Sequence, residues 1–247
     1  FERVGSTNDV VRDWLADGTD EVAVAVADEQ TAGRGRQGRT WTAPPAAALL
    51  LSAGFRPGWL PPERTWRLAA IVALAMADAA EAVAALAPGT IRLKWPNDLV
   101  IGGSGPGASP QIRKVAGILD ETSGLGTADP RAVVGIGVNA DWPAAAFPPE
   151  LAGSMTSLRE ASGGLPIDRD ALLARFLVRL EGRLDALRGG WFDVAGWTGR
   201  QVTTGHLVRL EGPAGLVELV RAVGVDGASG ALIVEAVEGP GSGGDGI

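Results

Sequence analysis

The amino-acid sequence predicts an α+β protein, in which a mixed β-sheet with flanking helices is followed by a small C-terminal β-domain. Short apolar runs without helical periodicity alternate with segments that have it along most of the chain. After Trp197 the pattern changes to short β-rich runs separated by turns, which is typical of a small β-barrel. With 247 residues, 46% of them hydrophobic, the chain is long enough for one or two domains with proper cores.

The elements of the N-terminal part follow from helix caps and apolar patterns. Ser6 or Thr7 can cap the first helix, and Gly18 marks its end. The next apolar runs lack helical periodicity and predict buried strands, whereas a longer Ala-rich run predicts a buried or amphipathic helix. The elements expected after the first helix are strands at 21–28 and 48–55, a helix at 64–86, and strands at 91–95 and 99–101 around a turn at 96–98.

The rest of the chain is predicted to complete the sheet and then to form the separate β-domain. A Gly-, Pro- and Ser-rich segment, 102–110, predicts a surface loop, and the tail from Gly239 predicts disorder because it lacks apolar side chains. The expected elements are strands at 114–121 and 132–138, an amphipathic helix at 168–188, and β-runs at 200–204, 206–210, 216–225 and 231–237. The predicted domains are therefore 1–196 and 197–238, with a tail at 239–247.

Composition excludes several classes of function. A formal net charge of −7 argues against generic binding to nucleic-acid backbones. The chain has no cysteine and one histidine, His206, which excludes disulfides, thiolate catalysis and metal sites built from several cysteines or histidines. The longest apolar run, 68–87, contains Asp78 and Glu81, so no membrane span is expected. No signal-peptide pattern begins the chain, and a cytoplasmic protein is expected.

Lysine and asparagine are scarce, and their positions are informative. Of the 22 basic residues only Lys94 and Lys114 are lysines, and the only asparagines are Asn8, Asn97 and Asn139. All of them fall within a set of motif-bearing segments that makes up about a seventh of the chain: 5–8, 28–41, 94–98, 114–119 and 135–139. In a chain that otherwise uses Arg, this clustering predicts one shared polar site.

The segment Gly33–Arg39 interleaves three glycines with three arginines. It satisfies G-x-G-x-x-G after a predicted strand, but the Thr- and Pro-containing residues 40–45 cannot open the helix that a dinucleotide-binding fold requires. Glycines let backbone N–H groups line an anion-binding concavity, and guanidinium groups bind phosphate or carboxylate oxygens as a fork. The segment therefore predicts an anion-binding loop that could be disordered when empty; a solvated basic loop tip is the alternative.

Three further motifs carry four of the five scarce residues. Residues 94–98 (KWPND) place a lysine before a turn, for which ordinary turn chemistry explains the proline and asparagine but not the lysine. Residues 114–119 (KVAGIL) open a strand with the second lysine, and Gly117 indicates close approach of a ligand or another backbone; a charge at a strand edge is the alternative. Residues 135–139 (GIGVN) place two strand glycines before Asn139.

Together these motifs resemble a known family. The order GSTN at 5–8, DEQTAGRGRQGRTW at 28–41, KWPND, KVAGIL and GIGVN resembles the catalytic domain of biotin–protein ligases. The resemblance implies a class II synthetase-like catalytic domain followed by an SH3-like β-barrel. It also implies an activity in which biotin and ATP, with Mg²⁺, form biotinyl-5′-AMP and release pyrophosphate. Biotin is then transferred to one lysine of a biotin carboxyl carrier protein or domain of a biotin-dependent carboxylase.

The resemblance also implies roles for individual residues. The biotin-binding residues implied are Ser6, Thr7, Asn8, Gln30, Gly33, Arg34, Lys114 and Gly117. The residues implied to bind ATP or the adenylate are Arg36, Arg39, Trp41, Lys94, Asn97 and Asn139. The catalytic residues implied are Arg34, Arg36, Lys94, Asp98 and Lys114, with Asp98 orienting the acceptor lysine. The metal ligands are left open, since Mg²⁺ is expected to arrive with ATP.

The partners expected are biotin, ATP and the carrier protein, with neither nucleic acid nor membrane, for a monomer or homodimer. We expect a monofunctional ligase without an N-terminal DNA-binding domain. The loop at 102–112 is longer than the family pattern suggests. A lipoate–protein ligase is an alternative, but its motifs include a histidine on the substrate strand, whereas His206 lies in the predicted C-terminal domain. A non-enzymatic nucleotide- or phosphate-binding module is the other alternative.

Overall fold

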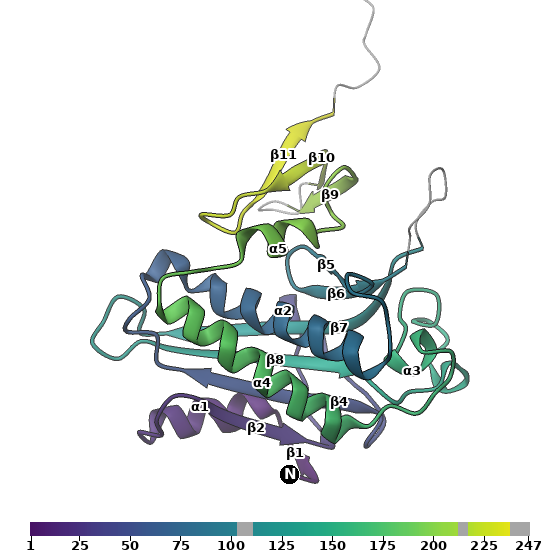
Figure 1. Ribbon diagram of the computed structural model, residues 1–247, viewed down its shortest axis with the longest axis horizontal. Helices are drawn as coiled ribbons and strands as arrows, with labels where there is room; N and C mark the ends of the chain where they lie inside the picture. Colours follow the sequence, from purple (N-terminus) through teal and green to yellow (C-terminus); the bar gives the residue numbers. More distant parts are fainter. Residues whose placement is uncertain (103–110, 212–216, 238–247) are drawn as a thin grey trace, which may run out of the picture.

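The computed structural model describes residues 1–102, 111–211 and 217–237, and its centre is a six-stranded sheet (Figure 1). The strands in spatial order are β2 (Ala23–Ala27), β4 (Ala48–Phe55), β8 (Arg131–Asn139), β7 (Arg113–Ser123), β6 (Asp98–Ile101) and β5 (Arg92–Lys94). Each neighbouring pair is antiparallel, so the prediction of a mixed sheet is wrong. Among the described residues, the strands of this sheet make parallel contacts only at two isolated bridges, Leu93–Gln201 and Lys114–Met155.

Helices cover both faces of the sheet. Helices α2 (Trp66–Val83) and α4 (Arg169–Arg188) pack together across one face (Figure 1), and the apolar core lies between them and the strands. Helix α1 (Thr7–Ala16) covers the other face beside β2 and β4. Side chains of β4 alternate between the two faces: Phe55 belongs to the α2–α4 core, whereas a Cβ on Gly54 would meet Val11 of α1 at 2.5 Å.

Shorter elements complete the fold. They are β1 (Arg3–Val4), which pairs in parallel with β3 (Glu29–Gln30), the 3₁₀ turns Arg36–Gly38, Pro62–Arg64 and Ala144–Ala146, and the helices α3 (Leu158–Ala161) and α5 (Val194–Gly199). The predicted order of the main strands and helices is confirmed, although the helix expected at 64–86 is shorter at both ends. No helix among the described residues is both long and apolar enough to cross a membrane.

The C-terminal part forms a second, three-stranded antiparallel sheet. Its order is β11 (Leu232–Ala236), β10 (Val217–Val225) and β9 (Leu207–Glu211). The predicted β-run at 200–204 is not a strand of this sheet; only Gln201 makes a bridge, and its partner is Leu93 in β5. The C-terminal sheet lies beside α5 and the start of α2 (Figure 1), where the Arg67 side chain donates a 3.4 Å hydrogen bond to the Gly227 carbonyl. Residues 103–110 of the predicted loop, residues 212–216 between two of the predicted C-terminal β-runs, and the tail from Gly239 lie outside the described residues.

Candidate functional site

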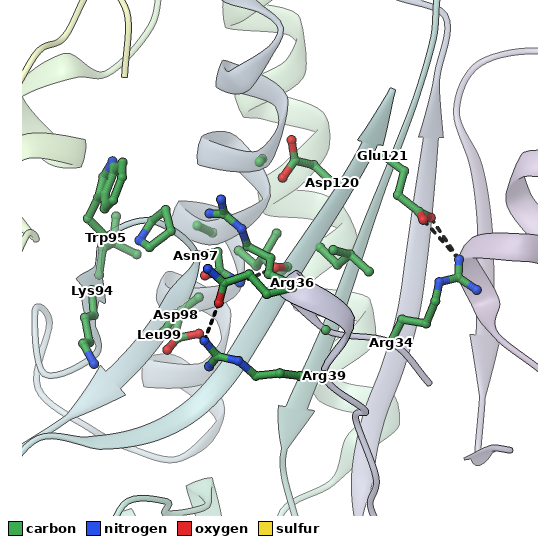
Figure 2. A pocket seen from close by; sticks show the side chains of 18 of the residues that line it. Arg34, Arg36, Arg39, Lys94, Trp95, Asn97, Asp98, Leu99, Asp120 and Glu121 are labelled. Carbon is green, nitrogen blue, oxygen red and sulfur yellow. Dashed lines mark hydrogen bonds and ion pairs between the residues drawn. The ribbon is translucent and has the colours of Figure 1, made fainter. Parts of the chain in front are cut away.

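A cavity of about 970 Å³ opens where the short strand β6 begins and its antiparallel partner β7 continues past it. The last residue pair between these strands is Asp98–Gly117, so the edge of β7 from Ile118 to Glu121 borders the cavity. Its other walls are residues 33–39, called the Gly/Arg loop below, three alanines of α2, and the β5–β6 turn at residues 95–97. Trp197, Gln201 and Gly230 of the C-terminal part complete the lining. Figure 2 shows that the Gly/Arg loop and the β5–β6 turn lie on neighbouring sides of this space.

Three cations border the cavity and have no carboxylate partner in the part of the chain that the structure describes. Arg36, Arg39 and Lys94 make no ion pair with any described residue, and the Arg39 guanidinium donates a hydrogen bond to the side chain of Gln37 (2.8 Å). Lys94 is exposed at the end of β5. Since unpaired guanidinium and ammonium groups bind phosphate and carboxylate oxygens, this side of the cavity suits a polyanion.

The Gly/Arg loop is folded as a tight hairpin. The backbone N–H of Trp41 donates to the Gly33 carbonyl (2.9 Å), and that of Gly35 donates to the Arg39 carbonyl (2.7 Å). Gln37 adopts φ 57°, and a Cβ on Gly33 would lie 2.4 Å from the Trp41 carbonyl oxygen. Glycine is therefore required at position 33 for the close approach of the two ends of the loop.

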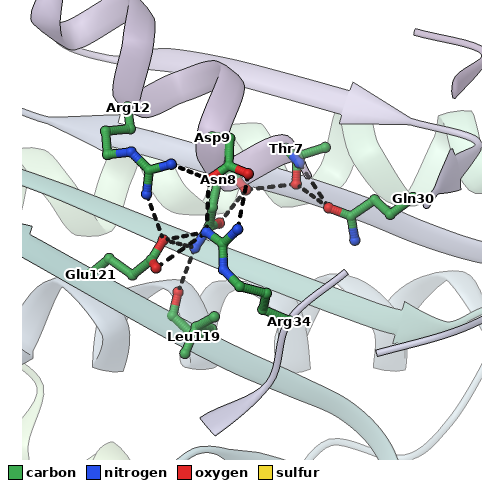
Figure 3. Close-up of polar contacts among 9 residues, drawn as sticks. Thr7, Asn8, Asp9, Arg12, Gln30, Arg34, Leu119 and Glu121 are labelled. Atoms are coloured by element: carbon green, nitrogen blue, oxygen red, sulfur yellow. Dashed lines mark hydrogen bonds and ion pairs between the residues drawn. The ribbon is translucent and has the colours of Figure 1, made fainter. Parts of the chain in front are cut away.

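Arg34 anchors this loop through ion pairs. It donates two 2.9 Å hydrogen bonds to the Asp9 carboxylate and one of 3.1 Å to Glu121, as Figure 3 shows. Glu121 also accepts from Asn8 (2.8 Å), and Arg12 contacts both carboxylates. Arg34 thus differs from the other two arginines of the loop, because its charge is compensated by α1 and β7.

The hydrogen bond from Arg34 lowers the pKa of the Asp9 carboxyl below its ordinary value of 3.8, with a smaller contribution from Arg12 and partial opposition from burial. A carboxyl whose folded pKa is lowered stabilises the fold above its unfolded pKa, and this stabilisation is lost as pH falls through the folded pKa. We therefore expect Asp9→Asn to lower the free energy of unfolding at neutral pH and to flatten its fall below about pH 4. Urea unfolding from pH 6 to 2 measures this, and equal pH profiles for variant and parent would contradict it.

A polar cluster joins α1 to β3 and β4 near the loop. The backbone N–H and hydroxyl of Thr7 donate to Gln30 Oε1 (2.8 and 3.0 Å), and the buried Ser52 hydroxyl lies 2.5 Å from Asn8 Oδ1. Ser6 is buried at the N-cap of α1. The structure thus brings together the predicted residues of 5–8 and 28–41, and adds Ser52, which no motif marked.

Lys114 lies in a compact group with Asp98, Gly117 and Trp41. Its Nζ is 2.7 Å from Asp98 Oδ1 and 5.3 Å from the centre of the Trp41 ring. A Cβ on Gly117 would lie 2.8 Å from this Nζ, and one on Gly137 would lie 2.5 Å from the Trp41 ring. The strand glycines therefore form a floor on which the lysine and the indole rest, and the atoms that approach Gly117 closely belong to side chains rather than to the ligand or second backbone that was predicted.

The two remaining asparagines hold backbone segments together. Asn97 donates from Nδ2 to the Ile118 carbonyl (2.7 Å) and accepts from the Ile118 N–H at its own carbonyl (2.9 Å), which ties the β5–β6 turn to β7. Asn139 is buried and donates to the Thr156 carbonyl (2.9 Å). Neither Asn139 nor Trp41 lines the cavity.

Two carboxylates of this region, Asp9 and Glu121, were not predicted as site residues. The acidic pair Asp120–Glu121 was visible at the end of a predicted strand, where solvated carboxylates are common. Nothing in the sequence marks Asp9, since an acidic residue in the first turn of a helix is ordinary. Their pairing with Arg34 depends on the packing of α1 against the sheet.

Comparison with known proteins identifies the family. A model of the biotin/lipoate A/B protein ligase family matches residues 1–139. The chain belongs to this family. The resemblance inferred from the motifs is thereby confirmed.

Individual proteins that are similar to this chain are named as ligases of the same family. The chain is 34% identical over 215 residues to the biotin–[acetyl-CoA-carboxylase] ligase of Mycobacterium tuberculosis, covering 86% of the chain and 74% of that protein. It is 32% identical over 180 residues to the bifunctional ligase/repressor BirA of Bacillus spizizenii, covering 73% of the chain and 51% of BirA, about half of that relative. The biotin protein ligase from Aquifex aeolicus in complex with biotin and ATP superposes with a TM-score of 0.75 and 26% identity, over 95% of the chain and 89% of that ligase.

Proposed function

We propose that this family member is an ATP-dependent biotin–protein ligase, which forms biotinyl-5′-AMP and transfers biotin to a lysine of a biotin carboxyl carrier protein. The observation that carries the proposal is the ion pair between Lys114 and Asp98, because Asp98 lines a cavity that is also bordered by three cations without carboxylate partners among the described residues. Joining a carboxylate to a triphosphate brings two anions together, so the site must supply positive charge at their junction. The names of the relatives support the same activity.

The residues then divide between the two substrates. Biotin lies near the polar cluster and the glycine floor, with its carboxylate beside Lys114. ATP lies in the cavity, with its phosphates facing Arg36, Arg39 and Lys94. A biotin carboxylate oxygen attacks the α-phosphorus and pyrophosphate leaves; the acceptor amine then attacks the biotinyl carbonyl and AMP leaves. No protein nucleophile is needed, in agreement with the cysteine-free sequence.

Mg²⁺ is part of the proposal because it would arrive on the phosphates of ATP. The described residues contain no group of three His, Asp or Glu side chains placed to hold a metal. Asp120 lines the cavity and has no ion pair among the described residues. Its carboxylate would therefore hold Mg²⁺ together with the phosphate oxygens of ATP, a ligand set that suits this ion. Bound there, Mg²⁺ would neutralise charge on the phosphates.

The acceptor lysine was predicted to be oriented by Asp98. Since Asp98 pairs with Lys114 at 2.7 Å, we propose that it acts through this lysine, and that the acceptor amine enters as the pair rearranges. The C-terminal sheet is proposed to belong to an SH3-like barrel in a domain that begins near residue 197. A cytoplasmic location is also proposed, because the reaction consumes ATP.

Pyrophosphate exchange into ATP tests the activity. We expect exchange with biotin, and none with lipoate or without an acid. Exchange with lipoate alone would favour the lipoate-ligase alternative. The absence of exchange under all three conditions would overturn the proposed function and would favour the alternative of a non-enzymatic nucleotide-binding module.

The loop anchor gives a prediction about the intermediate. Arg34→Ala removes the ion pairs that tie the loop to α1 and β7, so biotinyl-5′-AMP is expected to leave the enzyme several-fold faster. Release is measured by chromatography of the free adenylate after separation from the protein. Arg12→Ala is the matched control, since Arg12 contacts the same carboxylates without belonging to the loop. Equal release from both variants would contradict the anchoring role.

A further inference from the structure

The segment that follows α5 backs the outer edge of β5, the three-residue strand that ends at Lys94. The Leu93 N–H donates to the Arg200 carbonyl and the Val202 N–H donates to the Leu93 carbonyl, both at 2.8 Å. Leu93 and Gln201 form a parallel bridge. A strand this short pairs weakly along one edge alone, so the second edge contact contributes to its position.

The residue after Lys94 is also held by the C-terminal part. The Trp95 N–H donates to the hydroxyl of the buried Thr203 (2.9 Å), and the Trp95 indole donates to the Gly230 carbonyl (3.1 Å). Lys94 thus lies between two residues whose backbone N–H groups both bond to this segment, while its own side chain stays exposed at the cavity.

Arg200 connects the same segment to α2. Its guanidinium donates to Glu81 Oε1 (2.8 Å), to Asp78 Oδ1 (2.6 Å) and to the Ile91 carbonyl (2.7 Å). The buried Glu81 also accepts from the Ile91 N–H (2.8 Å), so both backbone groups of the residue preceding β5 are bound to this network. Together with the Asn97–Ile118 hydrogen bonds, these contacts fix the chain on both sides of Lys94.

We propose that Thr203 and Arg200 are positioning residues, which hold β5 so that Lys94 meets the phosphates of ATP. The inference rests on the proposed function, in which Lys94 is one of the cations bordering the nucleotide cavity. It assigns to the 200–203 segment a role in nucleotide binding that is exerted through the backbone of β5.

Thr203→Val is the main test, because it keeps the shape of the side chain and removes the acceptor for the Trp95 N–H. We expect the KM for ATP in biotin-dependent pyrophosphate exchange to rise about tenfold, as for loss of one buried hydrogen bond, with the KM for biotin near the parental value. Thr203→Ser keeps the hydroxyl and should restore the parental KM. Thr198→Val is the matched control, since its hydroxyl bonds only to carbonyls within α5.

Hydrogen exchange provides a readout that does not depend on activity. The backbone amides of residues 93–95, 97 and 98 should exchange faster in Thr203→Val than in the parent or in Thr198→Val. Unchanged exchange there would overturn the positioning role, as would equal rises in the KM values for ATP and biotin. A parent chain without biotin-dependent pyrophosphate exchange would overturn the proposed function and the role in ATP binding, while hydrogen exchange would still decide whether Thr203 holds β5.

Discussion

Lys114→Arg is expected to lower the rate of biotin adenylation at least about a hundredfold while leaving the fold intact, a loss in the range found when one group that stabilises a transition state is removed. The Lys114 ammonium lies against the glycine floor, beneath the Trp41 ring and 2.7 Å from Asp98. A guanidinium is longer and planar, so it cannot place its charge at the same point. Pyrophosphate exchange with biotin at saturating ATP measures the effect.

Lys94→Arg is the matched control for this substitution. The scarcity of lysine in the sequence suggests that both positions require it, but only Lys114 has a steric reason in the structure. Lys94 is exposed and has room for a larger cation, so Lys94→Arg should lose less than about tenfold. Parental activity in Lys114→Arg would show that the packing around this lysine is not needed for adenylation.

Arg200→Met is expected to lower the free energy of unfolding by about 3–5 kcal/mol, because it leaves the buried Glu81 without its cationic partner. The side chain of Glu81 is only 5% exposed, so water cannot compensate for the lost ion pair. Urea unfolding at neutral pH measures the change, and the melting temperature should fall by about ten degrees.

Two further variants separate the buried charge from general damage. Glu81→Gln in the Arg200→Met background removes the uncompensated charge but keeps an acceptor for the Ile91 N–H, so part of the lost stability should return. Arg159→Met removes a half-exposed pair with Asp141 and should cost no more than about 1 kcal/mol. Equal losses in Arg200→Met and Arg159→Met would contradict the importance of burial.

The main sheet and its helices could be predicted from the sequence because their signals are local. The bounds of β4 agree with the prediction, since its two buried faces require a continuous apolar run. The strand pairing of the C-terminal part was harder to predict from the sequence. Residues 200–204 have a β-like composition, but their partner is β5 rather than a neighbouring C-terminal strand, and partner choice depends on which edge lies close in space. Helix α5 was missed because its six residues include two glycines.

Part of the candidate site could also be predicted, because the motifs that carry its residues are local signals in the sequence. The contacts among Lys114, Asp98, Gly117 and Trp41 agree with the grouping that the motifs suggested. The use of Asn97 and Asn139 to hold backbone segments could not be predicted, since their partners lie in distant segments.

By itself the sequence determined the family, through five motifs, and the set of charges available to the site. Only the tertiary structure decided which of these charges are compensated. The packing of α1 and β7 against the loop pairs Arg34 with Asp9 and Glu121, whereas Arg36 and Arg39 of the same loop make no ion pair among the described residues. The physical reason is that the interaction of two charges depends on their distance and on the surrounding solvent, and both are set by chain segments far apart in the sequence.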